Sequence, residues 1–499
     1  MPKFVFLWTD FVLWLVVAGV VLYSWRARSR PNVRATWMHV ARDAPAMCAA
    51  VVLTVMISVA LLDSIHFRPR LPPAPGVAAD APAVFATRTV SILDTLLVHA
   101  IESREKTYSK PLAWWSFQKE TQVVDGQEVR SNPRLVYGGA HLKDPERDWK
   151  PDLTARSLRG VLLGLAAGGL VVILLAALRG RGHGGLRASL TEIVRGETEL
   201  PWRPMAITIC ATAMLIGWFA AIWPWYHPFG TDRTGNDVLY QALKSIRTAV
   251  VIGSLSTIAT LPLAIALGIL AGYFKGWVDD VIQYFYTVLS SIPPILLVAA
   301  FVLLVNVYID QNVDRFETGV ERAEFRLFLL TLILGVTGWA TLCRLLRAET
   351  LKIAELDYVQ AAHAFGVSHW RVMARHILPN VMHLVLIVAV LDFSALVLYE
   401  AVLSYVGVGV DPNSSSFGSM INLARSEMSR DPVVWWNLAT AFTFMLMLVL
   451  AANLFADAVR EAFDPRARAF RPRRKTRRLE AKPSGSIATE ALSGAGAKA

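Results

Sequence analysis

The fold is decided by residues 161–178, Val-Leu-Leu-Gly-Leu-Ala-Ala-Gly-Gly-Leu-Val-Val-Ile-Leu-Leu-Ala-Ala-Leu, a stretch without a charged side chain. An α-helix needs about 20 apolar residues to cross the hydrocarbon layer of a membrane. The run that contains this stretch, 157–178, meets that length, and eight others do too: 4–23, 45–62, 204–224, 248–272, 281–306, 327–346, 383–405 and 433–456. The sequence therefore predicts an all-α, polytopic membrane protein with about nine spanning helices.

The overall composition and the placement of charge agree with a membrane protein. Hydrophobic residues make up 54% of the chain and charged residues 18%, whereas soluble domains have roughly 45–50% and 25%. Continuous runs of this length exclude a transmembrane β-barrel, which shows short alternating strands. The net charge of +11 comes from basic clusters at 25–42, 179–203 and 466–478, which lie beside apolar runs. Such clusters mark cytoplasmic loops that face anionic lipid, so we expect membrane lipid and no nucleic acid as a partner.

Placing the basic clusters inside gives one consistent orientation and five regions. The first apolar run is expected to stay as an anchor, because Met1–Phe6 lacks a basic start and no small-residue cleavage site precedes a soluble stretch; a cleaved signal peptide is the alternative. The regions are an N-terminal pair of helices at 1–63, an extracytoplasmic insert at 64–156, a transmembrane pair with a cytoplasmic linker at 157–224, a transmembrane core at 225–466 and a basic, disordered tail at 467–499. The insert contains several aromatic residues and is expected to fold in part.

The polar segment 347–381 lies between two spans on the predicted inner face. Its pattern predicts a short helix from Tyr358 to Phe365, capped by Asp357 and ended by Gly366, and a second helix from His369 to Ile377, capped by Ser368 and closed by Pro379. The first helix has small side chains on one face, which would allow another protein to approach closely. An amphipathic helix that lies on lipid is the alternative.

The pattern Gln360-Ala361-Ala362, then Gly366, then Leu378-Pro379 resembles the coupling loop of binding-protein-dependent ABC importer permease subunits. In that family Glu usually stands where this chain has Gln360. Residues 227–239, 268–279, 400–409, 417–420 and 458–466 further resemble the dipeptide/oligopeptide and nickel branch of the family, in the order found in its second, C-type permease subunit. The resemblance covers about half of the chain and says little of residues 1–200, so either 45–62 or 204–224 could supply the first helix of the core.

The resemblance implies a non-catalytic subunit of an ATP-driven importer in the bacterial inner membrane. Its core would be the six-helix bundle of type I importer permeases and would form half of a pathway for di- or oligopeptides. The implied partners are a second homologous permease, two ATPase subunits and an extracytoplasmic substrate-binding protein. Nickel complexes, sugars or other small solutes, or peptide export, are the alternatives. The residues implied in contact with the ATPase are Tyr358, Gln360, Ala361, Ala362, Phe365, Gly366, Leu378 and Pro379.

Two acidic residues fall inside the eighth run, Asp392 and Glu400. Carboxylates at membrane depth usually face a bundle interior or a cavity, so Asp392 is expected to line the pathway or to meet another subunit. Glu400 lies near the outer interface and is expected to be structural.

Catalytic and metal-binding signatures are missing from the sequence. Neither G-x-x-x-x-G-K-[ST] nor H-E-x-x-H occurs, so we expect no cofactor, with ATP bound by the partner subunits. His369, His376 and His383 recur every seventh residue, about 10.5 Å apart along a helix, which is too far for one metal ion. A membrane-embedded enzyme and a sensor are rival classes, but the first would need clustered catalytic groups and the second an inner signalling domain.

Overall fold

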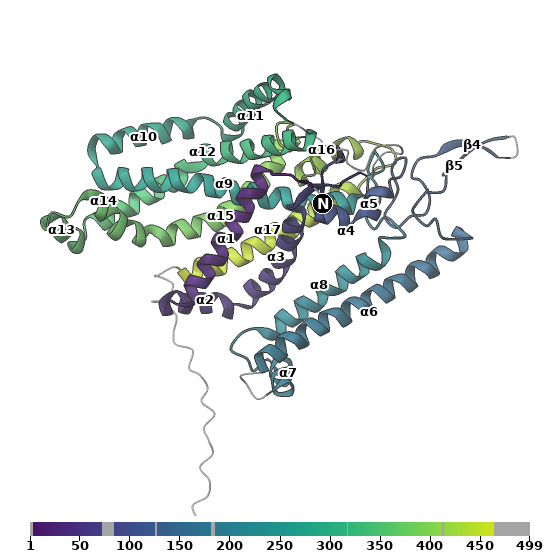
Figure 1. Ribbon diagram of the computed structural model, residues 1–499, viewed down its shortest axis with the longest axis horizontal. Helices are drawn as coiled ribbons and strands as arrows, with labels where there is room; N and C mark the ends of the chain where they lie inside the picture. Colours follow the sequence, from purple (N-terminus) through teal and green to yellow (C-terminus); the bar gives the residue numbers. More distant parts are fainter. Residues whose placement is uncertain are drawn as a thin grey trace, which may run out of the picture.

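The computed structural model describes residues 3–71, 84–124, 127–180, 185–316, 318–411 and 414–463, and most of them are helical (Figure 1). Within these ranges, nine helical segments are long and apolar enough to span a membrane, which confirms the predicted number. They are α1 (Trp8–Arg28), α3 (Ala44–Asp63), α6 (Pro145–Gly180), α8 (Trp202–Ile222), α9 (Val238–Phe274), α11 (Pro294–Gln311), α12 (Gly319–Ala354), α15 (Leu378–Tyr405, with the turns before it) and α17 (Trp436–Phe463).

Shorter elements connect the spans. The helices are α2 (Pro31–Arg42), α4 (Ile92–Leu96), α5 (Val98–Glu102), α7 (Leu186–Arg195), α10 (Gly276–Ser291), α13 (Asp357–Ala364), α14 (His369–Val372) and α16 (Phe417–Glu427), with a 3-10 turn at Val313–Arg315 and a π turn at Met373–Ile377. Strands β1 (Lys3–Phe4), β2 (His66–Arg68) and β3 (Val90–Ser91) form one antiparallel sheet, and β4 (Glu120–Val124) pairs with β5 (Gln127–Ser131).

The core of the bundle is built around α9, which packs against α12, α15, α3 and α17. Figure 1 shows α9, α12 and α15 running side by side. Small residues allow these helices to approach closely: a Cβ added at Gly253 of α9 would lie 2.6 Å from the ring of Phe393 on α15. Close approach through small residues is the usual way in which helices associate in a membrane.

The helices α6 and α8 form a hairpin whose main contact with the bundle is α8 against α3. Gly160, Gly164 and Gly168, spaced one turn apart on α6, face α8, and Gly217 of α8 faces back. An added Cβ at Gly168 would lie 3.0 Å from the Cα of Cys210, so the two backbones nearly touch. Of the two candidates for the first core helix, α3 thus lies against α9 and α17, whereas α8 is paired mainly with α6.

The sixth apolar run, 281–306, was predicted as one span, and this prediction is wrong. The chain forms two helices instead, α10 and α11, which are separated by extended backbone at Ile292 (ψ 131°) and Pro293 (ψ 123°). A proline lacks the N–H of a helical hydrogen bond and disfavours helix at the residue before it. The pair Pro293-Pro294 therefore breaks the helix, and only α11 qualifies as a span.

The insert packs on the loop that precedes α9. The carboxylate of Glu105 accepts hydrogen bonds from the backbone N–H groups of Val136, Tyr137 and Gly138 at 2.8–3.0 Å, and Gly235 lies directly against the backbone of Glu105. The helix that follows begins at Pro145, inside the range predicted for the insert. The predicted disordered tail 467–499 lies outside the described residues.

Candidate functional site

The helix α13 is held at the end of the bundle opposite to the insert. The span α9 runs from the loop that touches the insert to Phe274, and Tyr273 at that end donates to or accepts from His363 Nε2 at 2.7 Å and His369 Nδ1 at 2.9 Å. An exposed ion pair joins Lys275 to Glu355 at 2.5 Å, and the lysine lowers the pKa of that carboxyl. These contacts fix the segment 355–369 to the end of α9.

Buried valine and isoleucine side chains anchor the same segment to the ends of the spans. Val359, Val372 and Ile377 are completely buried and pack in one cluster with residues of α9, α12 and α15. Close to this cluster, Arg347 on α12 donates two hydrogen bonds to Asp279 on α10, at 2.5 and 2.6 Å. The Arg347 guanidinium lowers the pKa of Asp279 against the opposing effect of burial. The segment is therefore a rigid protrusion and not a loose loop.

The outward side of this protrusion carries three exposed aromatic side chains among polar ones. The exposed fraction is 87% for Phe365, 70% for Trp370 and 44% for Tyr358. Ala361 is exposed and Ala362 half-buried, so the small face predicted from the sequence is partly turned outward. Large aromatic side chains exposed together on a rigid element are typical of a protein-binding surface.

The turn after α13 requires glycine because of its backbone and not because of crowding. Gly366 has φ +71°, and an added Cβ would meet no atom within 4 Å. A left-handed φ at the residue after a helix is the usual glycine stop. The prediction that Gly366 ends the first helix is confirmed.

Two details of the predicted segment are wrong, and the predicted cap Ser368 is confirmed in position only. Leu356, not Asp357, is the N-cap of α13, and Asp357 is its first residue. Ser368 is the N-cap of α14, but its side chain makes no capping hydrogen bond. Pro379 does not close the second helix: it occupies the first turn of α15, where a proline costs no hydrogen bond. The chain runs from α14 through the π turn into α15 without interruption.

The remaining predicted contact residues lie around this surface. Gln360 is exposed, and its amide donates to the carbonyl of Glu355 at 3.2 Å. Leu378 is half-buried and Pro379 exposed. Asn380 joins the start of α15 to α13, because its amide donates to the hydroxyl of Tyr358 at 3.0 Å. The structure thus brings the predicted residues together on one end of the bundle.

The two carboxylates of α15 have different surroundings. Glu400 is 1% exposed and accepts a hydrogen bond from Ser404 at 2.6 Å, so it is part of the packing of α15 with α16. Asp392 is half-buried and has no hydrogen-bonding or ionic partner among the residues the structure describes. The hydroxyl of Tyr399, about two turns along the same face, is buried and likewise unpaired.

The three regularly spaced histidines do not converge. His369 faces Tyr273, His376 lies beside the ring of Tyr358, and His383 Nδ1 contacts the carbonyl of Asn380 at 2.7 Å. Within the described ranges, no three His, Cys, Asp or Glu side chains are grouped so that they could hold a metal ion.

Sequence reasoning missed the buried charges at the opposite, insert-bearing end. Arg247 of α9 pairs with Asp10 of α1 and Glu324 of α12, and Lys244 pairs with Asp63 and Asp94. The signal that could have found them is a basic residue at the start of an apolar run, balanced by acidic residues at the ends of others.

One further ionic contact joins the insert to the core loop. His227 Nδ1 lies 2.8 Å from Asp237 Oδ2, and its Nε2 lies 3.7 Å from the Glu105 carboxylate. Burial disfavours the charge on His227, but Asp237 and Glu105 raise its pKa to about 9. The protonated imidazole therefore links the insert to the loop before α9.

Comparison with known proteins places the core among transport proteins. Residues 264–469 match the family described as binding-protein-dependent transport system inner membrane component. The chain is 30% identical over 243 residues to the oligopeptide transport system permease protein OppC of Haemophilus influenzae, covering 49% of this chain and 71% of that protein. It is 30% identical to the glutathione transport system permease protein GsiD of Pectobacterium atrosepticum, covering 48% of this chain and 73% of that protein. It is 28% identical to the dipeptide transport system permease protein DppC of Lactococcus lactis, covering 48% and 64%.

Proposed function

This chain belongs to the binding-protein-dependent transport system inner membrane components, and we propose that it is the C-type permease subunit of an ATP-driven importer of di- or oligopeptides. It is a multi-pass protein of the bacterial inner membrane. The peptide cargo is inferred from relatives that are named as oligopeptide, dipeptide and glutathione permeases.

The observation that carries the proposal is the rigid protrusion with an aromatic outer side. We propose that Phe365, Trp370 and Tyr358 insert into a groove on an ATPase subunit, while Val359 and Ile377 transmit its movement to the spans. Because the protrusion continues into α15 without a break, a push on α13 would tilt that span directly. Rigid-body tilting of helices around a path is a known way to alternate access between two sides.

The remaining parts of the transporter would come from other chains. Two ATPase subunits would bind and hydrolyse ATP, a second homologous permease would complete the pathway, and an extracytoplasmic protein would deliver the substrate. This chain would contribute no catalytic residue and no cofactor.

We further propose that the face of α15 that carries Asp392 lines the pathway or meets the second permease. A polar group without a hydrogen-bonding partner costs several kcal/mol in the hydrocarbon of a membrane. A half-buried position with an unpaired carboxylate is therefore a poor lipid surface. With Cys48, Cys210 and Cys343 replaced by Ala, labelling of Asp392→Cys in native membranes by a water-soluble thiol reagent would support a position on the aqueous pathway. No labelling by either reagent would support a position against the second permease, and labelling only by a lipid-soluble reagent would exclude both.

Co-purification tests the proposed ATPase contact. The wild-type chain and Gly366→Trp are each purified from the native membrane, and Gly169→Trp, at an open position on the outer side of α6, is the control. We expect wild type and control to recover ATPase subunits and a second permease, and Gly366→Trp to lose the ATPase while keeping the permease. Recovery of stable wild-type chain alone would refute the proposal.

A further inference from the structure

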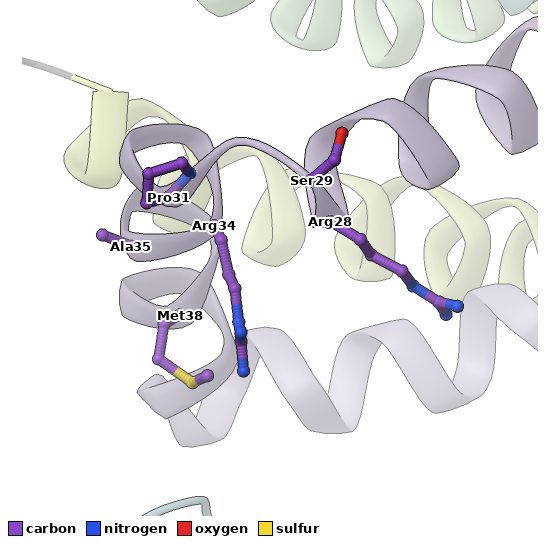
Figure 2. Close-up of a pocket in the computed structure, with 6 residues that line it drawn as sticks. All are labelled: Arg28, Ser29, Pro31, Arg34, Ala35 and Met38. Atoms are coloured by element: carbon purple, nitrogen blue, oxygen red, sulfur yellow. The ribbon is translucent and has the colours of Figure 1, made fainter.

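The corner between α1 and α2 combines arginine side chains with a hollow, and neither feature has a part in the proposed transport role. Arg28 in the last turn of α1 and Arg34 in the second turn of α2 flank a hollow of about 440 Å³, whose other walls are Ser29, Pro31, Ala35 and Met38. Figure 2 shows Arg34 and Met38 extending from the same side of α2, while Arg28 extends from the end of α1 in a direction away from α2. The hollow is therefore lined by cationic groups beside an apolar surface.

The position of this corner in the membrane follows from the path of the chain. The span α3 runs from α2 to the insert, and α9 runs from the insert-bearing end to α13. Both α2 and α13 thus lie at the end opposite to the insert. Arg42 of α2 also lies 3.5 Å from Glu199, in the second basic loop. The α1–α2 corner therefore lies at the cytoplasmic surface of the membrane, at the same end of the spans as α13.

The helix α2 is fixed in this place and is not free to move along the surface. Its buried residues Thr36 and Val40 lie on the face toward α17, where Val40 packs with Val459 and Ala462. Trp37 packs edge-on against Phe463, with ring centroids 5.6 Å apart. The residues of the hollow lie on the other side of α2, so Arg34 and Met38 are presented at a constant position.

The charges of Arg28 and Arg34 are not paired within the described part of the chain. Neither guanidinium forms an ion pair or a hydrogen bond with any of the described residues, and both side chains are exposed. Arg26 and Arg30 add two positive charges to the same turn, and the nearest acidic residue in sequence, Asp43, caps α3 instead. The cytoplasmic leaflet carries anionic lipids that attract such groups.

From this arrangement we infer that the α1–α2 corner binds one anionic phospholipid of the inner leaflet. The phosphate lies at the hollow that Arg28 and Arg34 line, and either guanidinium can pair with its oxygens. The glycerol and the first methylenes lie against Pro31, Ala35 and Met38. A soluble anion would use the two arginines and gain nothing from the apolar wall, which is why a lipid fits the site better than free phosphate.

The test titrates the purified full-length chain in detergent with phosphatidylglycerol and follows its thermal unfolding. Phosphatidylcholine and inorganic phosphate are titrated in parallel. The variant Arg28→Gln/Arg34→Gln is compared with Arg187→Gln/Arg195→Gln, which removes the same charge from exposed positions of α7. Because the arginines of the corner make no structural contact, their replacement leaves the fold intact.

We expect saturable stabilisation of wild type by phosphatidylglycerol only. The corner variant should need roughly ten- to thirtyfold more lipid for half of the effect, and the α7 variant should behave as wild type. Equal weakening in both variants would overturn the proposal in favour of diffuse attraction, and full stabilisation by inorganic phosphate would overturn the choice of a lipid.

Discussion

The guanidinium of Arg247 on α9 and the carboxylate of Asp10 on α1 form a buried ion pair, with Nη2 and Oδ1 2.5 Å apart. The Arg247 side chain is 4% exposed and that of Asp10 10%. Glu324 of α12 reaches Arg247 from the other side at 2.7 Å. The N-terminal helix, which lies outside the region matched by the family, is therefore bonded to the core span α9.

Replacing Asp10 by Asn tests this connection. Removing one partner of a buried pair typically costs about 3–5 kcal/mol, and we expect the lower end of that range because Glu324 still faces Arg247. The free energy of unfolding in detergent is the measurement. The control is Glu355→Gln, which breaks an exposed pair and should change the free energy of unfolding far less. Equal losses in the two variants would show that the Asp10 pair is not structural.

The contact between the insert and the core loop should depend on pH through His227. Its pKa is raised to about 9, above the value of about 6.5 in an unfolded chain. The folded state thus binds the proton more tightly, so the stabilisation is complete below pH 6.5, approximately, and is lost as the pH rises through 9. We expect the thermal midpoint to fall between pH 7 and pH 10. In Asp237→Asn the midpoint should be lower at pH 7 and should change less over this interval; a slope equal to that of wild type would contradict the assignment.

The turn at Gly366 should tolerate residues according to their ability to adopt a positive φ. Asn adopts the left-handed region readily, whereas a β-branched residue does so at a cost of roughly 1–2 kcal/mol. An added side chain meets no neighbour at this position, so bulk is not a factor within the chain. Gly366→Asn should therefore retain ATPase recovery and Gly366→Val should reduce it. Equal recovery with both variants would mean that the backbone of this turn does not matter for the contact.

The α6–α8 hairpin should be sensitive to bulk on one face of α6 only. An added Cβ at Gly164 would lie 2.8 Å from the Cα of Met214, but one at Gly169 would meet no atom within 4 Å. Overpacking typically costs about 1–3 kcal/mol. We expect Gly164→Val to lower the thermal midpoint and Gly169→Val to leave it unchanged. A matching loss at Gly169 would show that valine acts through something other than the packing of α6 on α8.

Much of the architecture follows from the sequence because its signals are local. Uncharged runs such as 161–178 predict the spans, and the short helix stopped by Gly366 follows from residues within a few positions. The break at Pro293-Pro294 was also a local signal, but the length of the apolar run outweighed it.

Other features depend on contacts between distant residues. The pairing of Asp10 with Arg247, the hydrogen bonds of Glu105 and the docking of the insert join segments far apart in the chain. No periodicity or spacing predicts which charges meet. Likewise, the sequence indicates that Phe365 lies near a contact surface, but only the fold shows that Phe365 is almost fully exposed while Val359 in the same segment is buried.

Cysteine cross-linking at Phe365 tests the central claim most directly. The native residues Cys48, Cys210 and Cys343 are replaced by Ala, and a single cysteine is introduced as Phe365→Cys or, as the control, as Val194→Cys on α7, where the native side chain is 71% exposed. A short bifunctional thiol reagent is then applied to native membranes, and adducts are identified by mass spectrometry. The account predicts an adduct with an ATPase subunit from Phe365→Cys and none from Val194→Cys. No ATPase adduct from Phe365→Cys, or equal adducts from both positions, would contradict it.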